Sequence, residues 1–375
     1  MHDKEMHPLI LPEPLVRIPE DVQTPAPVVD IDVLDRNIAG MASLLEDRHV
    51  GLRPHTKTSK CIEVVRRQVA AGVVGLTVAT LGEAEVLADA GFDDLFQAYP
   101  LWAGQSGKAQ RLRALHDRCR IMVGVESAEG AQALGRAVAG SDRRLGVMLE
   151  IDPGLHRTGV DPVAVATLAR AAERAGLDVV GVFTFGGHGY ANFGAPQAAA
   201  DDEVRVLGEA RDLLVRAGFD IRILSAGSTP TVRLSSRPPV TEERPGIYVF
   251  GDRQQVALGS AEPDAIALVV ATTVVASHPD GRFVIDAGSK VLGQDRSAYL
   301  PGFGAIAEYP DAEIRSLSEH HGVVWTGGAR PRVGDIVRVV PNHCCIVVNL
   351  FDALTIVRDG AVIDTWMIAG RGRNS

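Results

Sequence analysis

The strongest constraint on the fold is an alternation of apolar, strand-like runs with helical segments between about residues 26 and 250. Strand-like runs such as "GLTVAT", "RIMVGV" and "LGVMLEI" are separated by segments such as "AVATLARAAERAG", in which apolar residues recur at helical spacing before a terminal Ala-Gly. The alternation has a period of roughly 25 to 30 residues, which is typical of βα units in a parallel sheet. About eight or nine such units predict a (β/α)8 TIM-type barrel in preference to a doubly wound sheet.

The sequence pattern changes beyond about residue 255. Runs such as "ALVVATTVVAS" and "DIVRVV" are rich in Val, and the segments "HPDGR" and "RDGAV" carry the Asp-Gly signal of a hairpin turn. These features predict a C-terminal antiparallel β domain. We therefore expect a barrel over residues 26–255 and a β domain over 256–375 together with 1–25.

Composition excludes several classes of function. The formal net charge is −9, and the sequence offers no extended cationic surface of the kind that nucleic-acid binding needs, which argues against a nucleic-acid partner. The longest apolar run, "AIALVVATTVVA", is too short to span a bilayer, and the N-terminal segment has no signal-peptide core. Four cysteines in 375 residues do not make a disulfide framework. We expect a cytoplasmic protein that binds neither nucleic acid nor membrane.

The segment "GLRPHTKTSK" concentrates cationic side chains between apolar stretches. Because alternate residues of a barrel strand face the interior, Arg53, His55 and Lys57 are expected on one face, with Lys60 out of phase. Lys57 is nearest the C-terminal end of its strand, where barrel enzymes place catalytic residues. Neighbouring like charge disfavours the ammonium form and helps a lysine act as a nucleophile. Taken alone, such a stretch is more often a set of solvated cations.

A second motif, "SAGSTPT", ends a late strand and precedes a predicted helix with Thr229 at its N-cap and a proline in its first turn. Gly227, Ser228 and Thr229 then predict a phosphate cradle, with ordinary turn chemistry as the alternative. In "RPGIYVF", which follows, Gly246 allows backbone amides to approach closely. A Schiff-base lysine on the first strand with a phosphate site on the last ones suggests pyridoxal 5'-phosphate.

A third motif, "PNHCC", follows the β-run "DIVRVV". His343 and Cys345 are two residues apart, so they project from the same face of an extended chain, whereas Cys344 points to the core. Imidazole and thiolate suit zinc, and only two protein ligands leave room for water or a substrate oxygen, as a Lewis-acid site requires. On spacing alone, a structural role is the more common alternative. A cysteine ligand favours zinc over manganese or magnesium.

These motifs belong to an ordered series that extends from about residue 26 to the end of the chain. The series is "RPHTKTSK", "EIDPGLHRTGV", "GGHGY", "SAGSTPT", "ERPGIYVFGD", "DAGSK" and "PNHCC". It resembles the D-threonine aldolase and D-serine dehydratase family of alanine-racemase-like, fold-type III pyridoxal phosphate enzymes. The resemblance implies an eight-stranded barrel, a small β domain and a homodimer. Two departures concern the substrate pocket: Ser59 replaces a frequent His, and "EHHG" replaces a frequent "EEHG".

The resemblance also implies roles for single residues. Lys57 would hold the cofactor, and Arg157, for which an ion pair with the preceding acids is the alternative, would contact its phenolic oxygen. His188 is implied as a general base near the metal, with backbone capping as the alternative, and Tyr190 lies in the same motif. The predicted cofactor-binding set is Lys57, Arg157, Tyr190, Gly227, Ser228, Thr229, Gly246, Ile247 and Tyr248. His343 and Cys345 are the predicted metal ligands.

Other residues are weaker candidates. Asp252 in "VFGD" is interpreted as a helix cap in preference to a site residue. Lys290 in "DAGSK" is placed in a tight turn, on the dimer-interface side of the active site. His320 and His321 are adjacent, so they cannot both point into one site.

Together, these observations predict a lyase that depends on pyridoxal phosphate and a divalent metal and acts on β-hydroxy D-amino acids. D-threonine aldolase, which releases glycine and an aldehyde, is expected first, because the departures at Ser59 and His320 differ from the dehydratase pattern. D-serine dehydratase is the alternative, since both reactions use the same residues. An amino-acid racemase, which needs no metal ligands, and a non-catalytic cofactor carrier, which lacks a second domain, are further alternatives that "PNHCC" argues against.

Overall fold

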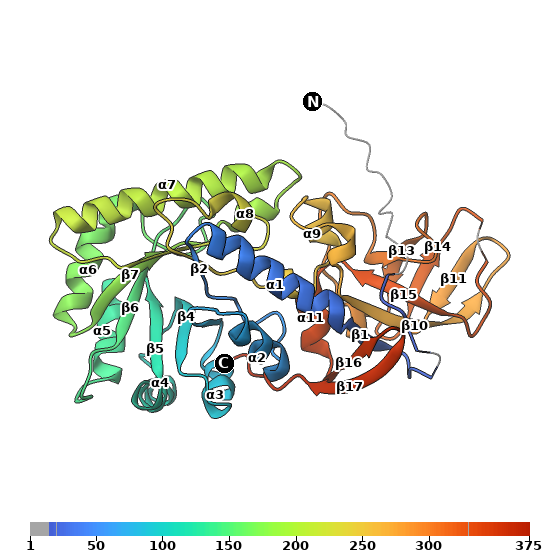
Figure 1. Ribbon diagram of the computed structural model, residues 1–375, viewed down its shortest axis with the longest axis horizontal. Helices are drawn as coiled ribbons and strands as arrows, with labels where there is room; N and C mark the ends of the chain where they lie inside the picture. The colour runs from blue at the N-terminus through green and yellow to red at the C-terminus, as the bar shows by residue number, and fades with distance from the viewer. Residues whose placement is uncertain (1–14, 20, 329) are drawn as a thin grey trace. The chain divides into compact units, whose positions relative to one another are not determined.

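The computed structural model describes residues 15–19, 21–328 and 330–375 (Figure 1). The chain divides into two compact units by the density of its internal contacts. One unit comprises the chain up to Ile38 together with Ile247–Arg371, and the other comprises Ala39–Gly246 with Gly372–Ser375. Helix α1 (Ile31–Asp47) contains the first boundary between them.

The unit formed by Ala39–Gly246 is a (β/α)8 barrel. Its eight parallel strands occur in the order β2, β9, β8, β7, β6, β5, β4, β3. An isolated parallel bridge between His55 and Thr77 joins the chain beyond β2 to β3 and closes the barrel. The strands are β2 (Gly51–Leu52), β3 (Leu76–Val78), β4 (Asp94–Pro100), β5 (Arg120–Val125), β6 (Gly146–Glu150), β7 (Asp178–Phe183), β8 (Ile223–Ala226) and β9 (Glu242–Glu243). The barrel predicted from the βα alternation is confirmed.

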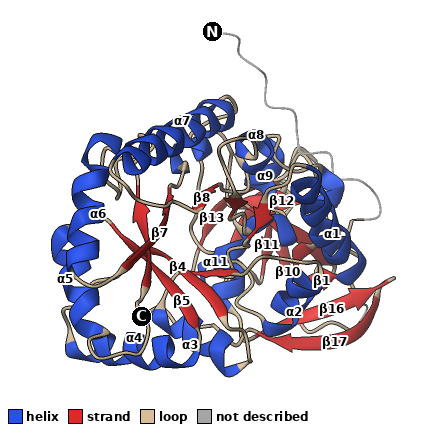
Figure 2. Cartoon of the chain, turned by 60° about the vertical axis from the view of Figure 1, so that its left-hand side comes forward, coloured by secondary structure: helices blue, strands red, loops and turns tan. Residues whose placement is uncertain are grey.

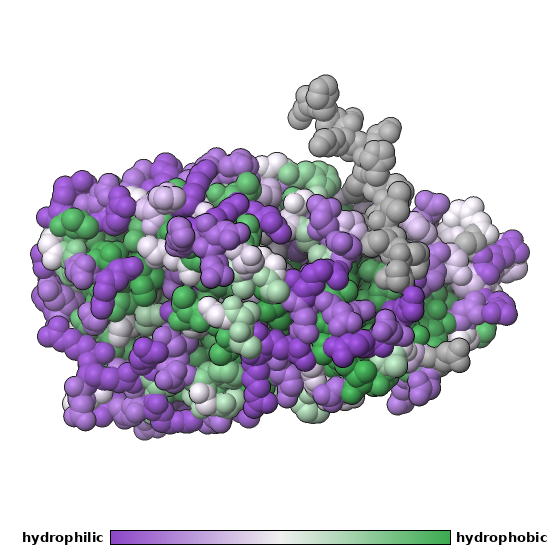
Figure 3. Space-filling model, in the orientation of Figure 1, coloured by the Kyte–Doolittle hydropathy of each residue, from purple (hydrophilic) through white to green (hydrophobic). Residues whose placement is uncertain are grey.

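Helices lie outside the barrel strands (Figure 2). They are α2 (Ile62–Ala70), α3 (Leu81–Asp89), α4 (Ser106–Arg118), α5 (Ala128–Ala137), α6 (Val165–Arg174), α7 (Ala195–Arg216) and α8 (Val232–Ser235). Helix α6 shows why these segments are helical: Val165, Leu168 and Ala172 recur at helical spacing and are buried. On the face of the molecule shown in Figure 3, hydrophilic side chains cover much of the surface, with apolar side chains between them.

Inside the barrel, Phe96 and Phe183 pack edge to face, with ring centroids 5.1 Å apart, against Met148 and Val180. These four side chains form an apolar cluster in the interior of the barrel. The carboxyl ends of the strands are where we locate the candidate cofactor residues.

The second unit is built on a mostly antiparallel sheet, which confirms the predicted β domain. Among its described residues the strands run in the order β13, β14, β11, β10, β1, β16, β17, with β15 beside β10 and β12. The strands are β1 (Ala26–Asp30), β10 (Leu268–Ser277), β11 (Arg282–Ile285), β12 (Gly304–Ile306), β13 (Glu313–Leu317), β14 (Gly322–Trp325), β15 (Ile336–Pro341), β16 (Ala353–Arg358) and β17 (Ala361–Met367). Its helices are α9 (Arg253–Ala257), α10 (Ser289–Leu292) and α11 (Cys344–Leu350).

Two features of this sheet test the sequence analysis. Both Asp-Gly hairpins form: β10 pairs with β11, and β16 pairs with β17 across Asp359 and Gly360, which have positive φ. Strand β1, expected as a barrel strand, instead pairs antiparallel with β10 and parallel with β16. Its apolar residues pack on Val269 and Val357, so burial in the sheet of the β domain decides its place.

The sequence predicts neither a membrane-spanning helix nor a disulfide framework. Within the described ranges, no helix has both the length and the apolar character that crossing a membrane requires. All four cysteines are free thiols, with Cys61, Cys119 and Cys344 buried and Cys345 half-buried.

Candidate active site

Lys57 lies beyond the carboxyl end of β2, as predicted, but in a turn and not in an extended strand. The strand ends at Leu52, His55 forms the closing bridge, and Lys60 N donates to Thr56 O at 2.8 Å to close the turn. The alternation that grouped three cationic residues on one strand face therefore does not extend to Lys57, because the chain turns first. The Lys57 side chain is exposed.

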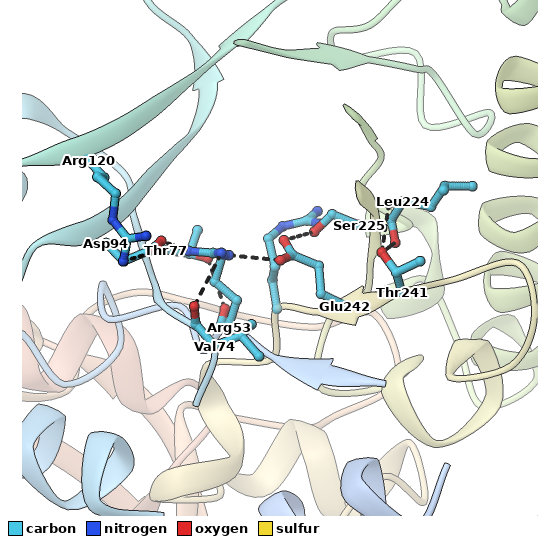
Figure 4. Close-up of polar contacts among 10 residues, drawn as sticks. Arg53, Val74, Thr77, Asp94, Arg120, Leu224, Ser225, Thr241 and Glu242 are labelled. Atoms are coloured by element: carbon cyan, nitrogen blue, oxygen red, sulfur yellow. Dashed lines mark hydrogen bonds and ion pairs between the residues drawn. The ribbon is translucent and has the colours of Figure 1, made fainter. Parts of the chain in front are cut away.

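Arg53 does not supply the free positive charge expected beside Lys57. Its guanidinium is buried, with Nη1 2.6 Å from Asp94 Oδ1 and Nε 2.9 Å from Glu242 Oε2 (Figure 4). These two ion pairs hold β2 to the strands β4 and β9. Arg53 is thus a structural cation of the barrel, and its part in activating Lys57 was wrongly predicted.

Lys60 is also held by specific partners. Its Nζ lies 3.4 Å from Glu83 Oε1 and 2.9 Å from Asn374 Oδ1, and its backbone φ is +48°. Burial raises the pKa of Glu83, although Lys60 and the amide of Ala79 oppose the shift. Of the two lysines in the motif, Lys57 is therefore the one whose amine faces solvent.

Lys57 and Arg157 both lie near the ring of Phe185. Lys57 Nζ lies 5.9 Å, and Arg157 Cζ 4.9 Å, from the centroid of the Phe185 ring. Burial lowers the pKa of His55 well below its usual range, and the charges of Lys57, Arg244 and Arg157 lower it further. His55 is accordingly a neutral imidazole within a group of cations, which together attract an anionic ligand.

The acids that precede Arg157 have other partners. Glu150 Oε1 accepts a hydrogen bond from Thr158 Oγ1 at 2.7 Å, and Asp152 Oδ2 lies 2.8 Å from His156 Nδ1. The contact that the structure shows for Arg157 is with the Phe185 ring.

The predicted phosphate motif follows β8. Gly227 has φ +94°, and a Cβ there would lie 1.7 Å from Glu243 Oε2, so only glycine fits. Ser228 Oγ is 3.0 Å from Thr231 Oγ1. Thr229 Oγ1 is buried and has no hydrogen-bond partner among the described residues. An unpaired buried hydroxyl beside a glycine turn fits a phosphate oxygen as its missing partner.

The helix expected at this motif differs from the prediction. Helix α8 begins at Val232, its N-cap residue is Thr231, and it has only 4 residues. Thr229 therefore lies in a turn before the helix, and within that turn Thr231 Oγ1 accepts a hydrogen bond from Ser228 N at 3.0 Å. The fit to phosphate rests on the turn and its hydroxyls, without a helix dipole.

Gly246 packs against the lysine turn. A Cβ at this position would lie 2.6 Å from Thr58 Oγ1 and 2.9 Å from His55 O, so the absence of a side chain permits the contact. His55 N also donates to Pro245 O at 3.0 Å. The next residues, Ile247 and Tyr248, begin a buried 3-10 helix of the other unit.

His188 and Tyr190 lie in the 3-10 helix Gly187–Tyr190, which follows β7. His188 Nε2 is 3.4 Å from Asp202 Oδ2 of α7, and neither ring nitrogen forms a hydrogen bond within the described part of the chain. A buried imidazole nitrogen without a hydrogen bond can accept a proton from a bound ligand.

Sequence reasoning missed a buried polar network around Arg244, Glu203 and Glu243. Arg244 donates to Ser225 Oγ and Thr184 O, and Glu203 Oε1 accepts from the backbone amides of the loops that follow β7 and β8. Burial, together with the charge of Glu203, raises the pKa of Glu243 well above its usual value. Charged residues within predicted strand and helix segments, as in "TEERPG", were the available signal.

The predicted metal ligands lie at the start of α11, shortly after the end of β15. His343 is the extended N-cap residue of α11, and Cys345 belongs to its first turn, so the expected extended chain does not continue to Cys345. Burial lowers the pKa of His343, but the neighbouring Cys345 and Asp252 raise it to well above its ordinary value. Cys344 is fully buried, as expected.

Asp252 completes this part of the site. Its side chain is fully buried, and Oδ2 lies 3.2 Å from His343 Nδ1 and 3.1 Å from Cys344 N. In the described ranges, no group of three or more His, Cys, Asp or Glu side chains is arranged to hold a metal. Imidazole and thiolate are donors that suit a divalent metal, so the assignment of His343 and Cys345 as ligands stays a prediction.

Comparison with known proteins decides the family. The family model of the alanine racemase N-terminal domain matches residues 29–254, and that of the putative serine dehydratase domain matches residues 267–357. D-threo-3-hydroxyaspartate dehydratase of Delftia sp. (strain HT23) is 32% identical over 370 residues, which cover 92% of this chain and 97% of that protein. The chain belongs to the D-threonine aldolase and D-serine dehydratase family of pyridoxal phosphate lyases.

Other members of this family agree with the assignment. D-threonine aldolase of Arthrobacter sp is 28% identical over 369 residues, which cover 96% of this chain and 94% of that protein. The solved structure of the Delftia dehydratase has a TM-score of 0.86, with 92% of this chain and 97% of that chain covered. D-threonine aldolase from Filomicrobium marinum has a TM-score of 0.83 at 28% identity, with 96% and 98% covered. The family resemblance and the alanine-racemase-like fold are confirmed.

Proposed function

We propose that this protein eliminates the β-hydroxyl group of a D-amino acid with the help of pyridoxal phosphate and a divalent metal ion. The products are ammonia and a 2-oxo acid, because loss of the hydroxyl group gives an enamine that hydrolyses. The observation that carries the proposal is the His343–Cys345 pair with buried Asp252 beside it, within a family of pyridoxal phosphate lyases.

Relatives support elimination over retro-aldol cleavage. Solved structures of D-threo-3-hydroxyaspartate dehydratase include a histidine-to-alanine variant, and a cysteine-to-alanine variant in the metal-free form. The two substituted positions of that protein are separated by one residue, as are His343 and Cys345 here. The dehydratase is also more similar to this chain than the Arthrobacter aldolase, at 32% against 28% identity. Elimination is therefore our first candidate.

Most of the proposed cofactor contacts come from residues of the barrel. Lys57 would hold the cofactor, the hydroxyls of Ser228 and Thr229 would bind its phosphate, and Arg157 would contact its phenolic oxygen. Tyr190, Gly227, Gly246, Ile247 and Tyr248 complete the proposed set. When bound, pyridoxal phosphate supplies an electron sink for the negative charge that develops at the substrate Cα.

Lys57 and the metal ligands have separate tasks in the proposed reaction. The exposed amine of Lys57 takes the proton from Cα and returns it to solvent. His343 and Cys345 would hold a divalent ion, which supplies Lewis acidity for departure of the β-hydroxyl group. Imidazole and thiolate donors favour zinc over manganese or magnesium.

Retro-aldol cleavage by a D-threonine aldolase is the second candidate. It is favoured by His188, whose ring nitrogens form no hydrogen bond to the described residues and which is available to take the proton of a β-hydroxyl group. Cleavage of the Cα–Cβ bond would then release glycine and an aldehyde. The departures at Ser59 and His320 remain the sequence argument for this reaction.

Product analysis separates the candidates. The zinc-loaded holoenzyme is incubated separately with D-serine, D-threonine and D-threo-3-hydroxyaspartate, and ammonia, 2-oxo acid, glycine and aldehyde are measured. Elimination requires ammonia and 2-oxo acid in equal amounts, whereas glycine with aldehyde and no ammonia would support the aldolase. Change of configuration without either product set would favour the racemase, and no turnover with any amino acid would favour a cofactor carrier.

Two further proposals rest on the resemblance and the composition. A homodimer is proposed from the family, and size-exclusion chromatography with light scattering tests it. A cytoplasmic location is proposed from the composition, and fractionation of cells that express the protein tests it.

A further inference from the structure

We propose that Asp252 is a positioning residue that holds the His343 ring so that its Nε2 atom faces the metal. This inference rests on the metal assignment of the proposed function. The residues that carry it all belong to one compact unit. From its motif, Asp252 was interpreted as a helix cap, and the structure adds a second set of contacts.

The hydrogen-bond pattern determines which ring nitrogen carries a hydrogen. Asp252 Oδ2 lies 3.2 Å from His343 Nδ1 and accepts from Cys344 N at 3.1 Å. A carboxylate that already accepts a backbone hydrogen bond can pair with imidazole only as an acceptor, so Nδ1 donates to it. When the ring is neutral, as a metal ligand must be, its lone pair is then on Nε2, which is the atom left for a metal.

The carboxylate is held firmly in place. The Asp252 side chain is fully buried, and its other oxygen, Oδ1, accepts from Gln255 N at 3.0 Å and caps α9. Arg253, next in the chain, donates through Nη1 to Gly304 O at 3.1 Å and to Asn342 Oδ1 at 3.2 Å. Because Asn342 directly precedes His343, these bonds fix the segment that carries the metal ligands to the start of α9.

A helix cap and a positioning residue require different hydrogen-bonding atoms from the side chain at position 252. Capping uses Oδ1, and asparagine caps as well as aspartate does. Contact with His343 and Cys344 uses Oδ2, where the amide group of asparagine places a donor against two donors. Asp252→Asn therefore preserves the cap while it removes the acceptor for the ring.

The test measures zinc affinity of the purified holoenzyme by competition with a chromophoric chelator. If Asp252 positions His343, Asp252→Asn lowers zinc affinity by about 10- to 100-fold, the usual effect of losing such a partner. The cofactor absorbance should stay near the wild-type value, since the cap of α9 is kept, whereas the urea midpoint should fall because the buried amide of Cys344 loses its acceptor. Ser260→Ala is the matched control: it removes a hydrogen bond to Gln255 of α9 and touches neither His343 nor Cys345. Its zinc affinity should equal that of the wild-type protein.

The outcomes distinguish this inference from the proposed function. Equal zinc affinity of Asp252→Asn and wild type would overturn the positioning role and leave the metal site intact. Equal zinc affinity of His343→Ala and wild type would instead overturn the metal assignment itself. Nitrogen NMR of histidine-labelled, zinc-loaded wild-type protein needs no variant at position 252. The proposal expects a His343 ring with hydrogen on Nδ1 and zinc on Nε2, and the reverse arrangement contradicts it.

Discussion

Replacing Thr229 by valine should have opposite effects on the cofactor-free and cofactor-bound protein. Thr229 Oγ1 is buried without a hydrogen-bond partner among the described residues, and valine exchanges this hydroxyl for a methyl group of similar shape. In the cofactor-free protein the substitution therefore removes an unsatisfied polar group. In the holoenzyme it removes a donor to the proposed phosphate.

The two magnitudes follow from the same hydroxyl group. Burying an unpaired polar group costs about 1–3 kcal/mol, so Thr229→Val should raise the free energy of unfolding of the cofactor-free protein by up to about this amount. A hydrogen bond to a charged phosphate contributes about 1.5–3 kcal/mol, so cofactor affinity should fall by roughly 10- to 100-fold. Ser228→Ala is the comparison. Its Oγ already has Thr231 as a partner, so this change should destabilise the cofactor-free protein as well.

Urea unfolding of cofactor-free protein and titration with pyridoxal phosphate measure the two effects. The reasoning requires a higher urea midpoint and a weaker cofactor affinity in the same variant. A lower midpoint with unchanged affinity would show that the Thr229 hydroxyl has a protein partner and that the phosphate binds elsewhere.

Three further predictions follow from the charged groups and the metal. Borohydride reduction should attach the cofactor to one peptide in the wild type and in Lys60→Ala but not in Lys57→Ala, and attachment lost only in Lys60→Ala would reverse the lysine assignment. Glu243 has a folded-state pKa well above its ordinary value of 4.5, so stability should decline as pH rises above that value. Glu243→Gln should cancel this decline, whereas an unchanged pH profile would mean that Glu243 is ionised in the fold. Removing the metal with a chelator should stop turnover and leave the cofactor absorbance in place, and activity that survives chelation would contradict the metal assignment.

Local patterns predicted the barrel and the two hairpins because these features depend on residues that are near one another in sequence. The βα period and the two Asp-Gly hairpins depend on neighbouring residues, and both appear in the structure. The place of β1 could not be predicted in this way. Its partners β10 and β16 are distant in sequence, and an apolar run is equally suited to either sheet.

In the candidate site too, local patterns did not predict contacts between residues that are distant in sequence. Motifs and their order indicated Lys57, the phosphate turn and the His343–Cys345 pair. The contact of Arg53 with Glu242 joins residues 189 apart, and that of Asp252 with His343 joins residues 91 apart. No local pattern indicates such pairs. The sequence analysis therefore assigned Arg53 a role beside Lys57 that it does not have, and it did not predict the contact of Asp252 with His343.

The most direct test of the proposed reaction follows the hydrogen on Cα. D-threonine and D-threo-3-hydroxyaspartate carrying deuterium at Cα are supplied to the zinc-loaded holoenzyme, and the products are examined by mass spectrometry. Elimination breaks the Cα–deuterium bond, so turnover should slow relative to unlabelled substrate, and the label should pass to solvent as ammonia is released. Retro-aldol cleavage breaks the Cα–Cβ bond instead. Glycine that retains the deuterium, formed without ammonia, would contradict the proposal.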